Sequence, residues 1–521
     1  MKSFHNQGNS LTGRVRLTAL VLAAFAGAAV MVVELGVARI LTPVFGGSIS
    51  VWAIVIATTM LALAAGYAFG GYRADRTGGM VVACRAAAIG ALLCALLPFA
   101  RLPLIAHTID LATLTGAAIT AIVLISPPLF FLSQVSPALI RGLTATAGGG
   151  HVGVTAGGIY AVSTVGSLLG TLAAVWLFLY FPLMTGFIAT AMLVLIPVLI
   201  LHTWTGAAGL VVCCLLLGFA VTSNPGRVTA RDVYGRTLVL LDKRKSPYGE
   251  IRVVGLAGQY HFMIVNGFDQ GGINLQSGRS AYNFTEGLVD LGGFYTAPPT
   301  SVLVIGLGPG IISSRLRKSG VSVDVVEIDA AIYRVAHDYF NYTGDVTIDD
   351  GRRFLQRTDR RWDWIVVDAF AGGNPPWQLY TEEAFALYRR HLNRGGVVVL
   401  NFIGNRRDPA QRGALEAVVA TAREVFTTVD VYPNPWGSDD APTRNIFLAA
   451  AMQPRAEKIH PGDAGEAKSF TEALARSQPA SVVGGRILTD GAAPLEPLVR
   501  RTAELLRNRV RDFIPVELLI R

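Results

Sequence analysis

Long apolar runs make up most of the chain up to about Ser223, and a different pattern begins at Asn224. Before this boundary charged residues are scarce, and the apolar runs reach the length of about 20 residues that a membrane-spanning helix needs. After it, short β-type runs alternate with amphipathic segments, and charged residues are as frequent as in soluble domains. The pattern predicts an N-terminal α-helical transmembrane bundle, residues 1–223, followed by a C-terminal α/β domain.

The N-terminal bundle is predicted to contain about seven spanning helices. They are expected at about residues 17–41, 49–71, 80–100, 111–132, 157–181, 184–202 and 206–222, of which the last is short. Arg16 precedes the first span, and Arg73 and Arg141 follow the second and the fourth, so the positive-inside rule places the N-terminus in the cytoplasm. We expect a multi-pass protein of a bacterial-type inner cell membrane, with the lipid bilayer as a partner. Glu34 and Arg39 lie inside the first span, where charges either line a substrate pathway or form a structural ion pair.

Composition supports this division and excludes several classes of protein. Of 521 residues 52% are hydrophobic, and the mean hydropathy is +0.46, which is not typical of a soluble enzyme. The net charge of +9 accompanies no RNA- or DNA-binding motif, and arginines that flank membrane helices explain it, so we expect no nucleic-acid partner. All four cysteines lie in the apolar spans, a pattern that favours neither a disulfide framework nor a zinc site.

The C-terminal part begins with a β-hairpin region, predicted over residues 224–300 from two β-rich runs around a glycine-containing turn at 249–267. Strands are then expected at 301–305, 322–327, 346–348, 363–368, 396–402, 428–432 and 444–451, and helices at 311–319, 330–340, 381–392 and 409–424. Such alternation predicts a parallel, doubly wound sheet in a Rossmann-like domain, residues 301–452. Ligands of such sheets bind at the carboxyl ends of the strands.

The first of these strand ends carries a glycine-rich turn, "VIGLGPG", with Gly306, Gly308 and Gly310. Glycine lets the backbone approach a ligand closely. Dinucleotide-binding loops have their third glycine three residues after the second, whereas here the gap is two, which fits an adenosyl-sulfonium ligand better than NAD. A tight connection without a ligand would show the same turn, and this alternative stays open.

Acidic residues follow the next three strand ends in order. Glu327 ends "VVE" and is placed to accept the ribose hydroxyls of a nucleoside, while Asp329 fits the N-cap of the next helix. Asp350 is a candidate acceptor for an adenine amino group, and Asp368 is delivered to the mouth of the same pocket. Each acid alone is equally compatible with a helix cap or an exposed turn. Their order at successive strand ends favours a nucleoside site.

These residues resemble the spermidine synthase (polyamine aminopropyltransferase) family, and in particular its membrane-fused branch. The resemblance covers about residues 247–451 and rests on "SPYGEIRVV", "VNGFDQGG", "VIGLGPG", "VVEID", "IDDGRRFL", "VVDAF", "LYTEEAF" and "LNRGGVVV". It implies a class I methyltransferase-like fold. It also implies cofactor-binding roles for Gln270 and for the Asp350–Gly351 pair, and a role for Asp368 near the attacking amine.

The implied activity is transfer of an aminopropyl group from decarboxylated S-adenosylmethionine to a small-molecule amine such as putrescine, with release of methylthioadenosine. Asp368 would orient the amine and accept its proton. The loop at 372–380 is expected to close over the acceptor, with Trp377 and Tyr380 either binding a cation by their faces or simply packing the loop. No metal is implied.

Three positions depart from the family pattern. Pro309 stands where the family has an Asp that holds the amino end of the donor, Ala371 replaces an acid of the acceptor loop, and Gly249 replaces an early glutamine. An unpaired buried ammonium is strongly disfavoured, so donor and acceptor stay open. The alternatives are another S-adenosylmethionine-type enzyme with a different acceptor or an intramolecular reaction, and a non-catalytic nucleoside or polyamine sensor or transporter.

Two questions of organisation also stay open. Seven spans from a cytoplasmic N-terminus would place the C-terminal domain outside, whereas an adenosyl donor is expected inside, so the side of the domain is unresolved. The tail, residues 453–521, shows helical periodicity at 497–514. We expect a solvated amphipathic helix there; packing on the domain and self-association into a homo-oligomer are the alternatives.

Overall fold

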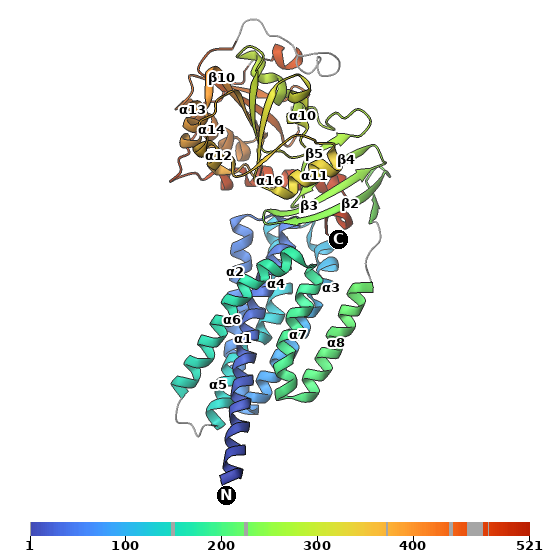
Figure 1. Cartoon of the computed structure of the whole chain (residues 1–521), viewed down its shortest axis with the longest axis vertical. Helices are drawn as coiled ribbons and strands as arrows, with labels where there is room; N and C mark the ends of the chain where they lie inside the picture. Colours follow the sequence, from blue (N-terminus) through green and yellow to red (C-terminus); the bar gives the residue numbers. More distant parts are fainter. Residues whose placement is uncertain are drawn as a thin grey trace. The chain divides into compact units, whose positions relative to one another are not determined.

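The structure is a computed structural model (Figure 1) that describes residues 2–146, 152–222, 228–370, 373–436, 441–455, 472–477 and 479–520. The chain divides into two compact units, essentially Met1–Gly226 and Arg227–Leu519. The first is entirely helical in its described part, and the second combines two β-sheets with helices.

The first unit is a bundle of apolar helices. They are α1 (Lys2–Phe45), α2 (Ile49–Thr77), α3 (Gly79–Thr108), α4 (Thr113–Ser133), α5 (Val135–Thr146), α6 (Val152–Tyr180), α7 (Leu183–Leu201) and α8 (Thr203–Thr222). Within the described residues six segments are long and apolar enough to cross a membrane, and α4 with α5 forms one of them. The seventh predicted span falls in α8, whose apolar part Thr203–Phe219 is shorter than these six. The predicted number of seven is therefore not confirmed.

Close packing in this bundle depends on small residues. Gly166 of α6 lies so near α1 that a Cβ there would clash with the backbone of Ala24, and the Ser167 hydroxyl donates to the carbonyl oxygen of Gly27 at 3.1 Å. Small residues of this kind let membrane helices approach each other closely. Glu34 of α1 is almost fully buried, 8% exposed, with the Thr59 side chain of α2 beside it.

The second unit opens with a five-stranded antiparallel sheet in the order β1-β2-β3-β4-β5. Its strands are β1 (Thr229–Arg231), β2 (Thr237–Ser246), β3 (Gly249–Leu256), β4 (Tyr260–Val265) and β5 (Phe268–Asn274). The hairpin predicted from sequence corresponds to β3 and β4. Its turn uses left-handed backbone at Ala257 and Gly258 (φ 49° and 68°).

A seven-stranded sheet follows, in the order β11-β12-β10-β9-β6-β7-β8. Its strands are β6 (Ser301–Ile305), β7 (Ser322–Glu327), β8 (Thr347–Ile348), β9 (Trp362–Val367), β10 (Leu392–Gly404), β11 (Thr428–Pro433) and β12 (Arg444–Ala451). Six strands run in one direction and five of them, β6 to β10, pair in parallel as predicted, but β12 runs antiparallel to both β10 and β11. The expectation of an all-parallel sheet was therefore wrong. The chain leaves β11 without a crossover helix in its described part and returns beside β10, which reverses the direction of β12.

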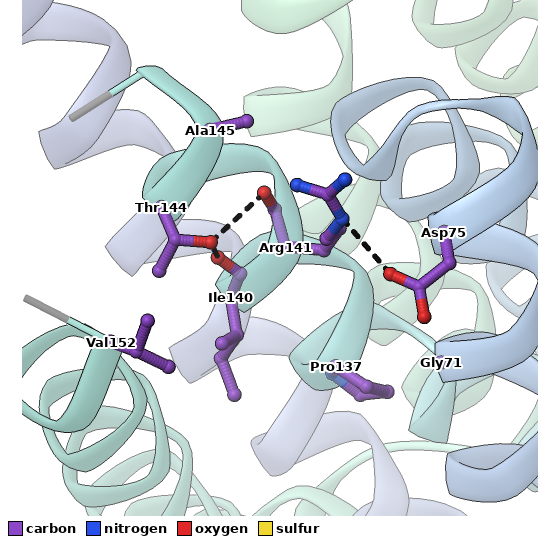
Figure 2. Close-up of a pocket in the computed structure, with 8 residues that line it drawn as sticks. All are labelled: Gly71, Asp75, Pro137, Ile140, Arg141, Thr144, Ala145 and Val152. Atoms are coloured by element: carbon purple, nitrogen blue, oxygen red, sulfur yellow. Dashed lines mark hydrogen bonds and ion pairs between the residues drawn. The ribbon is translucent and has the colours of Figure 1, made fainter. Parts of the chain in front are cut away.

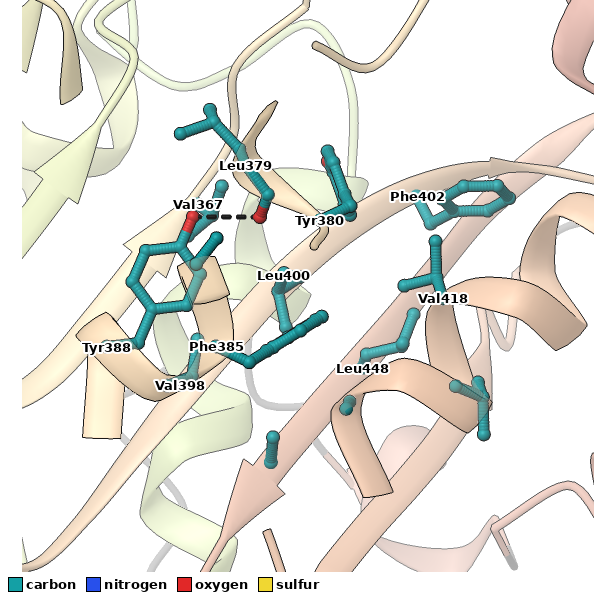
Figure 3. Packing of buried hydrophobic residues seen from close by; sticks show 14 of the residues in the cluster. Val367, Leu379, Tyr380, Phe385, Tyr388, Val398, Leu400, Phe402, Val418 and Leu448 are labelled. Atoms are coloured by element: carbon teal, nitrogen blue, oxygen red, sulfur yellow. Dashed lines mark hydrogen bonds between the residues drawn. The ribbon is translucent and has the colours of Figure 1, made fainter. Parts of the chain in front are cut away.

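The helices of the second unit are α9 (Phe284–Asp290), α10 (Ile311–Lys318), α11 (Ala330–Phe340), α12 (Gly351–Arg357), α13 (Glu382–Arg390), α14 (Pro409–Arg423), α16 (Leu495–Phe513) and α17 (Val516–Ile520), with 3₁₀ turns at Leu291–Phe294 and Trp377–Leu379. Helices cover both faces of the seven-stranded sheet, and α17 lies beside β3 of the small sheet. Alternate residues of each strand enter different cores. One core joins the sheet to α10, α11 and the small sheet. The other joins it to α13 and α14, where Phe385 and Tyr388 pack beside Val398, Leu400 and Val418 (Figure 3).

Candidate active site

The glycine-rich turn connects β6 to α10 and is shaped by its contacts. Gly306 has φ 95°, and a Cβ there would clash with the backbone carbonyl oxygen of Asp368 at the end of β9. Gly310 has φ 77°, and a Cβ there would clash with the Tyr342 ring. A side chain at either position would both strain the backbone and displace a neighbour. The turn therefore runs directly against the residue that we predicted to be catalytic.

Glu327 supports this turn from the end of β7. Its carboxylate accepts the backbone N–H of Leu307 and the backbone N–H of Asp329, each at 2.9 Å. The side chain is only 8% exposed, and burial raises the pKa of its carboxyl group. Glu327 thus positions the glycine-rich turn, and each of its oxygens keeps a further lone pair for a ligand. Its predicted contact with a ribose stays a prediction.

The acids after β8 are engaged with α12. The Asp350 carboxylate accepts the backbone N–H of Arg353 at 2.9 Å and so caps this helix, while Asp349 forms an ion pair with the Arg353 guanidinium. Gly351 lies against β6, because a Cβ there would come within 2.5 Å of Ile305 Cγ2. The structure therefore gives Asp350 a capping role, which leaves one of its carboxylate oxygens outside the cap hydrogen bond.

Asp368 directly follows β9, and two side-chain amides hold its carboxylate in place. The Asn401 side chain donates to its carboxylate at 2.8 Å, and the Asn445 side chain donates to the Asn401 side-chain oxygen at 3.0 Å. Desolvation raises the pKa of the Asp368 carboxyl to about 6, and the hydrogen bond from Asn401 opposes this rise. Sequence reasoning missed Asn401, which is 1% exposed on β10. The available signal was one polar residue inside the apolar run "VVVLNFI".

The small sheet reaches the glycine-rich turn through β5. Gln270 is the extra residue of a β-bulge, because Ile264 pairs with Asp269 and Met263 pairs with Gly271. Bulges re-aim side chains and occur often near active sites. A Cβ on Gly308 would lie 3.4 Å from the Gln270 carbonyl oxygen, and a Cβ on Gly271 would lie 2.9 Å from Pro309 Cγ. Pro309 therefore packs against the backbone of β5.

A second group of residues near the bulge was not among the predicted site residues. The Tyr282 hydroxyl donates to Asp269, whose other carboxylate oxygen accepts the backbone N–H of Gly271 at 2.8 Å. Desolvation raises the pKa of Asp269, and Arg509 of α16 opposes the rise. Gly249, by contrast, packs against the Asn266 side chain at the start of β3.

The two acceptor residues predicted in the loop after Asp368 have different environments. Trp377 is 43% exposed, whereas Tyr380 is fully buried in the core and donates from its hydroxyl to the Asn401 carbonyl oxygen at 3.4 Å. Asp368 contributes to a raised pKa of Tyr380, behind the larger effect of burial. The Tyr380 ring therefore lies near Asp368 as part of the core. Ala371 lies outside the described residues.

The helical unit contains a cavity of about 460 Å³ between α2, α5 and the start of α6 (Figure 2). Asp75 and Arg141 form an ion pair there at 2.9 Å, with both side chains largely exposed. In the part of the chain that the structure describes, no group of three or more His, Cys, Asp and Glu side chains is placed to hold a metal ion.

Comparison with known proteins finds similarity over part of the second unit. Residues 282–433 match the family model of the spermine/spermidine synthase domain. Over 130 residues the chain is 35% identical to a probable polyamine aminopropyl transferase of Bifidobacterium longum. The aligned residues cover 24% of this chain and 29% of the relative. Over 141 residues it is 34% identical to an N-terminal histidine N-methyltransferase of Emericella nidulans. Here the aligned residues cover 26% of this chain and 24% of the relative.

Among solved structures, a probable spermidine synthase from Corynebacterium glutamicum is 20% identical, with a TM-score of 0.38 over 52% of this chain and 99% of that one. The chain spans less than a third of the length of the two curated relatives just named. The seven-stranded mixed sheet by itself gives the second unit a Rossmann-like architecture. Residues 282–433 match the spermine/spermidine synthase domain, so the resemblance predicted from sequence is confirmed for this part.

Proposed function

We propose that the protein is a membrane-tethered aminopropyltransferase that uses decarboxylated S-adenosylmethionine and an amine such as putrescine. The observation that carries this proposal is the contact between the glycine-rich turn and Asp368, where Gly306 leaves no room for a Cβ beside the Asp368 backbone. A sulfonium donor whose nucleoside lies on that turn would have the carbon next to its sulfur near the desolvated Asp368 carboxylate. The match of residues 282–433 to the spermine/spermidine synthase domain supports the same activity.

The residues suit the two halves of such a reaction. Gly306, Gly308 and Gly310 offer a cradle without side chains, and Glu327 and Asp350 offer carboxylate oxygens for ribose and adenine. The amine nitrogen attacks the carbon next to the sulfonium, the carbon–sulfur bond breaks, and its electron pair stays on the sulfur of methylthioadenosine. The proton released by the new ammonium group passes to Asp368, whose pKa of about 6 suits a base at neutral pH.

A second candidate is transfer of a methyl group from S-adenosylmethionine to a different amine. It is favoured by the 34% identity to a relative that is named as a histidine N-methyltransferase. Pro309 is compatible with it, because the proline packs on β5 and offers no carboxylate to the amino end of a donor. The non-catalytic alternative, a nucleoside or polyamine sensor or transporter, would have no use for a base at position 368.

The test uses the full-length protein purified in detergent, given either sulfonium donor with or without putrescine, and products followed by mass spectrometry. Methylthioadenosine with a longer polyamine supports the first candidate. S-adenosylhomocysteine with a methylated amine supports the second, and binding of the donor without turnover supports the non-catalytic one. Asp368→Asn should abolish turnover, while Asp345→Asn, at an exposed position, serves as the matched control. If Asp368→Asn keeps full turnover, the assigned base is wrong.

A further inference from the structure

The C-terminal helix α16 connects the two sheets of the second unit. The Thr502 hydroxyl donates to the Gln411 side-chain oxygen of α14 at 3.0 Å, and further along the helix the Arg507 guanidinium lies over the Phe268 ring of β5, 5.0 Å from its centroid. Phe513 packs edge-on against Phe262 of β4. One face of α16 is thus part of the fold, so the expected solvated helix is packed along one side.

Phe268 places Arg507 next to the acceptor side of the candidate site. The Phe268 ring fills the space beside Gly373, where a Cβ would clash with it, and Gly373 lies five residues after Asp368 in the loop that follows β9. Phe268 is also two residues before Gln270, the bulged residue that meets the glycine-rich turn. Arg507 therefore reaches the candidate site through the Phe268 ring, which contacts Gly373 of the loop and lies two residues before the bulged Gln270.

Arg507 is a buried cation whose charge is poorly compensated. It is 6% exposed, and its Nε has no hydrogen-bond partner among the residues that the structure describes. Burial lowers the pKa of its guanidinium to about 9, Arg511 adds to this effect, and Glu504 opposes it. Glu504 already pairs with Arg501 at 3.1 Å. A desolvated cation without a dedicated carboxylate is unfavourable unless an anion arrives.

A buried acceptor without a partner lies in the same loop. Asn374 directly follows Gly373, and its side-chain oxygen is buried with no hydrogen-bond partner in the described part of the chain. Buried polar groups in native proteins are nearly always paired, and exceptions often mark places where a ligand or water binds. This edge of the site therefore offers one unpaired donor and one unpaired acceptor.

We propose that Arg507 binds a carboxylate of one substrate, so that the transfer proposed above uses an amino-acid-like donor or acceptor in place of decarboxylated S-adenosylmethionine or putrescine. The inference rests on the proposed function, because it concerns the substrate of that same site. The planar guanidinium matches a carboxylate in geometry and charge. The carboxylate has two possible sources: the donor, as intact S-adenosylmethionine, or the acceptor, as a diamino acid. In either case the Asn374 oxygen is available to a neighbouring ammonium group.

Two matched pairs of ligands separate these sources. S-adenosylmethionine differs from its decarboxylated form by one carboxylate, and ornithine differs from putrescine in the same way. Binding of all four to the full-length protein in detergent is measured by calorimetry, the two amines with methylthioadenosine present, and turnover is measured by mass spectrometry. We expect one carboxylated member to bind more tightly than its partner. Because a hydrogen-bonded charge pair is worth about 1.5–3 kcal/mol, Arg507→Met should weaken that ligand about 10- to 100-fold and leave its partner unchanged.

Controls keep the inference separate from the proposed activity. Arg500→Met removes an exposed arginine of the same helix. It should leave the affinity ratio within each ligand pair, carboxylated to uncarboxylated, unchanged. The ratio for Arg507→Lys should lie between those of wild type and Arg507→Met. Unchanged binding of methylthioadenosine shows that the variants are folded. Equal affinities within both pairs, or ratios that Arg507→Met does not alter, would overturn the inference. If no donor is turned over, the proposed activity fails, and the binding ratios still decide whether Arg507 recognises a carboxylate.

Discussion

Asn401 offers a direct way to test the electrostatics of the site, because it donates the hydrogen bond that stabilises ionised Asp368. Asn401→Leu keeps a side chain of similar size and removes the 2.8 Å bond to the carboxylate. Desolvation already raises the pKa of Asp368 to about 6, and Asn401 lowers it. Without the amide, the ionised form loses its donor and the pKa rises further.

The size of the change follows from the energy of one hydrogen bond to a charged group. Such a bond is worth about 1.5–3 kcal/mol, and one pKa unit corresponds to about 1.4 kcal/mol. The pKa should therefore rise by about one to two units. Below it Asp368 is protonated and cannot accept a proton, so kcat/KM should fall about tenfold per pH unit on the acid side. The acid limb of the wild-type profile is expected near pH 6, and that of Asn401→Leu near pH 7 or above.

The assay is methylthioadenosine release as a function of pH, with thermal melting to confirm that each variant is folded. Asn445→Ser is the matched control, because it removes the amide behind Asn401 and leaves the direct bond to Asp368 in place. Its acid limb should move by less than about half a unit, since the changed group is one step removed from the carboxylate. The reasoning is refuted if folded Asn401→Leu keeps the wild-type limb, or if the wild-type limb itself lies near the ordinary pKa of aspartate.

Three further predictions concern the cradle and the stability of the second unit. Gly306→Ala should weaken methylthioadenosine binding at least about tenfold, because its Cβ clashes with the Asp368 backbone; undiminished affinity in calorimetry would contradict the tight approach. Glu327→Gln should weaken the same binding by about 10- to 100-fold, because an amide leaves one backbone N–H without an acceptor, and an unchanged Kd would show that the carboxylate is not needed. Glu250 has a pKa lowered to about 2, with Arg252 as the largest favourable partner against the opposing burial. Its stabilisation should hold above its unfolded pKa and be lost as pH falls toward 2. Glu250→Gln should therefore lower the melting temperature at pH 7 more than at pH 3, and an equal loss at both would count against the ion pair.

Most elements of the second unit are predictable because its strands are short apolar runs bounded by glycine or acidic residues. The bounds of β6 and β7 agree with the expected residues. The direction of β12 was not predictable, because its residues are buried on both faces. A fully buried strand is an unbroken apolar run whichever way it runs. Only the pairing with β10 and β11 reveals that it is antiparallel.

Site residues differ in the same way: some can be predicted from their order along the chain, and others only from the contacts they make in the fold. Gly306, Glu327 and Asp368 lie at the carboxyl ends of β6, β7 and β9. The strand ends of a parallel sheet meet at one edge, so these positions along the chain predict that the residues come together. Arg507 belongs to an arginine-rich helix whose pattern shows one apolar face but not what that face covers. Which arginine is buried depends on the Phe268 ring of β5, more than two hundred residues earlier.

Pro309 and Arg507 both contact β5 and both bear on which substrates the site accepts. Pro309 fills the space over Gly271, so the turn gives up a position for a carboxylate and gains a contact with the small sheet. Arg507 adds a buried positive charge near the loop after Asp368. Both changes make the surroundings of the acceptor less suited to a doubly charged diamine, since a cation there would meet fewer carboxylates and one guanidinium. If Arg507 binds a carboxylate as we propose, the small sheet and the C-terminal helix would select the substrate, while the glycine-rich turn would hold only the nucleoside.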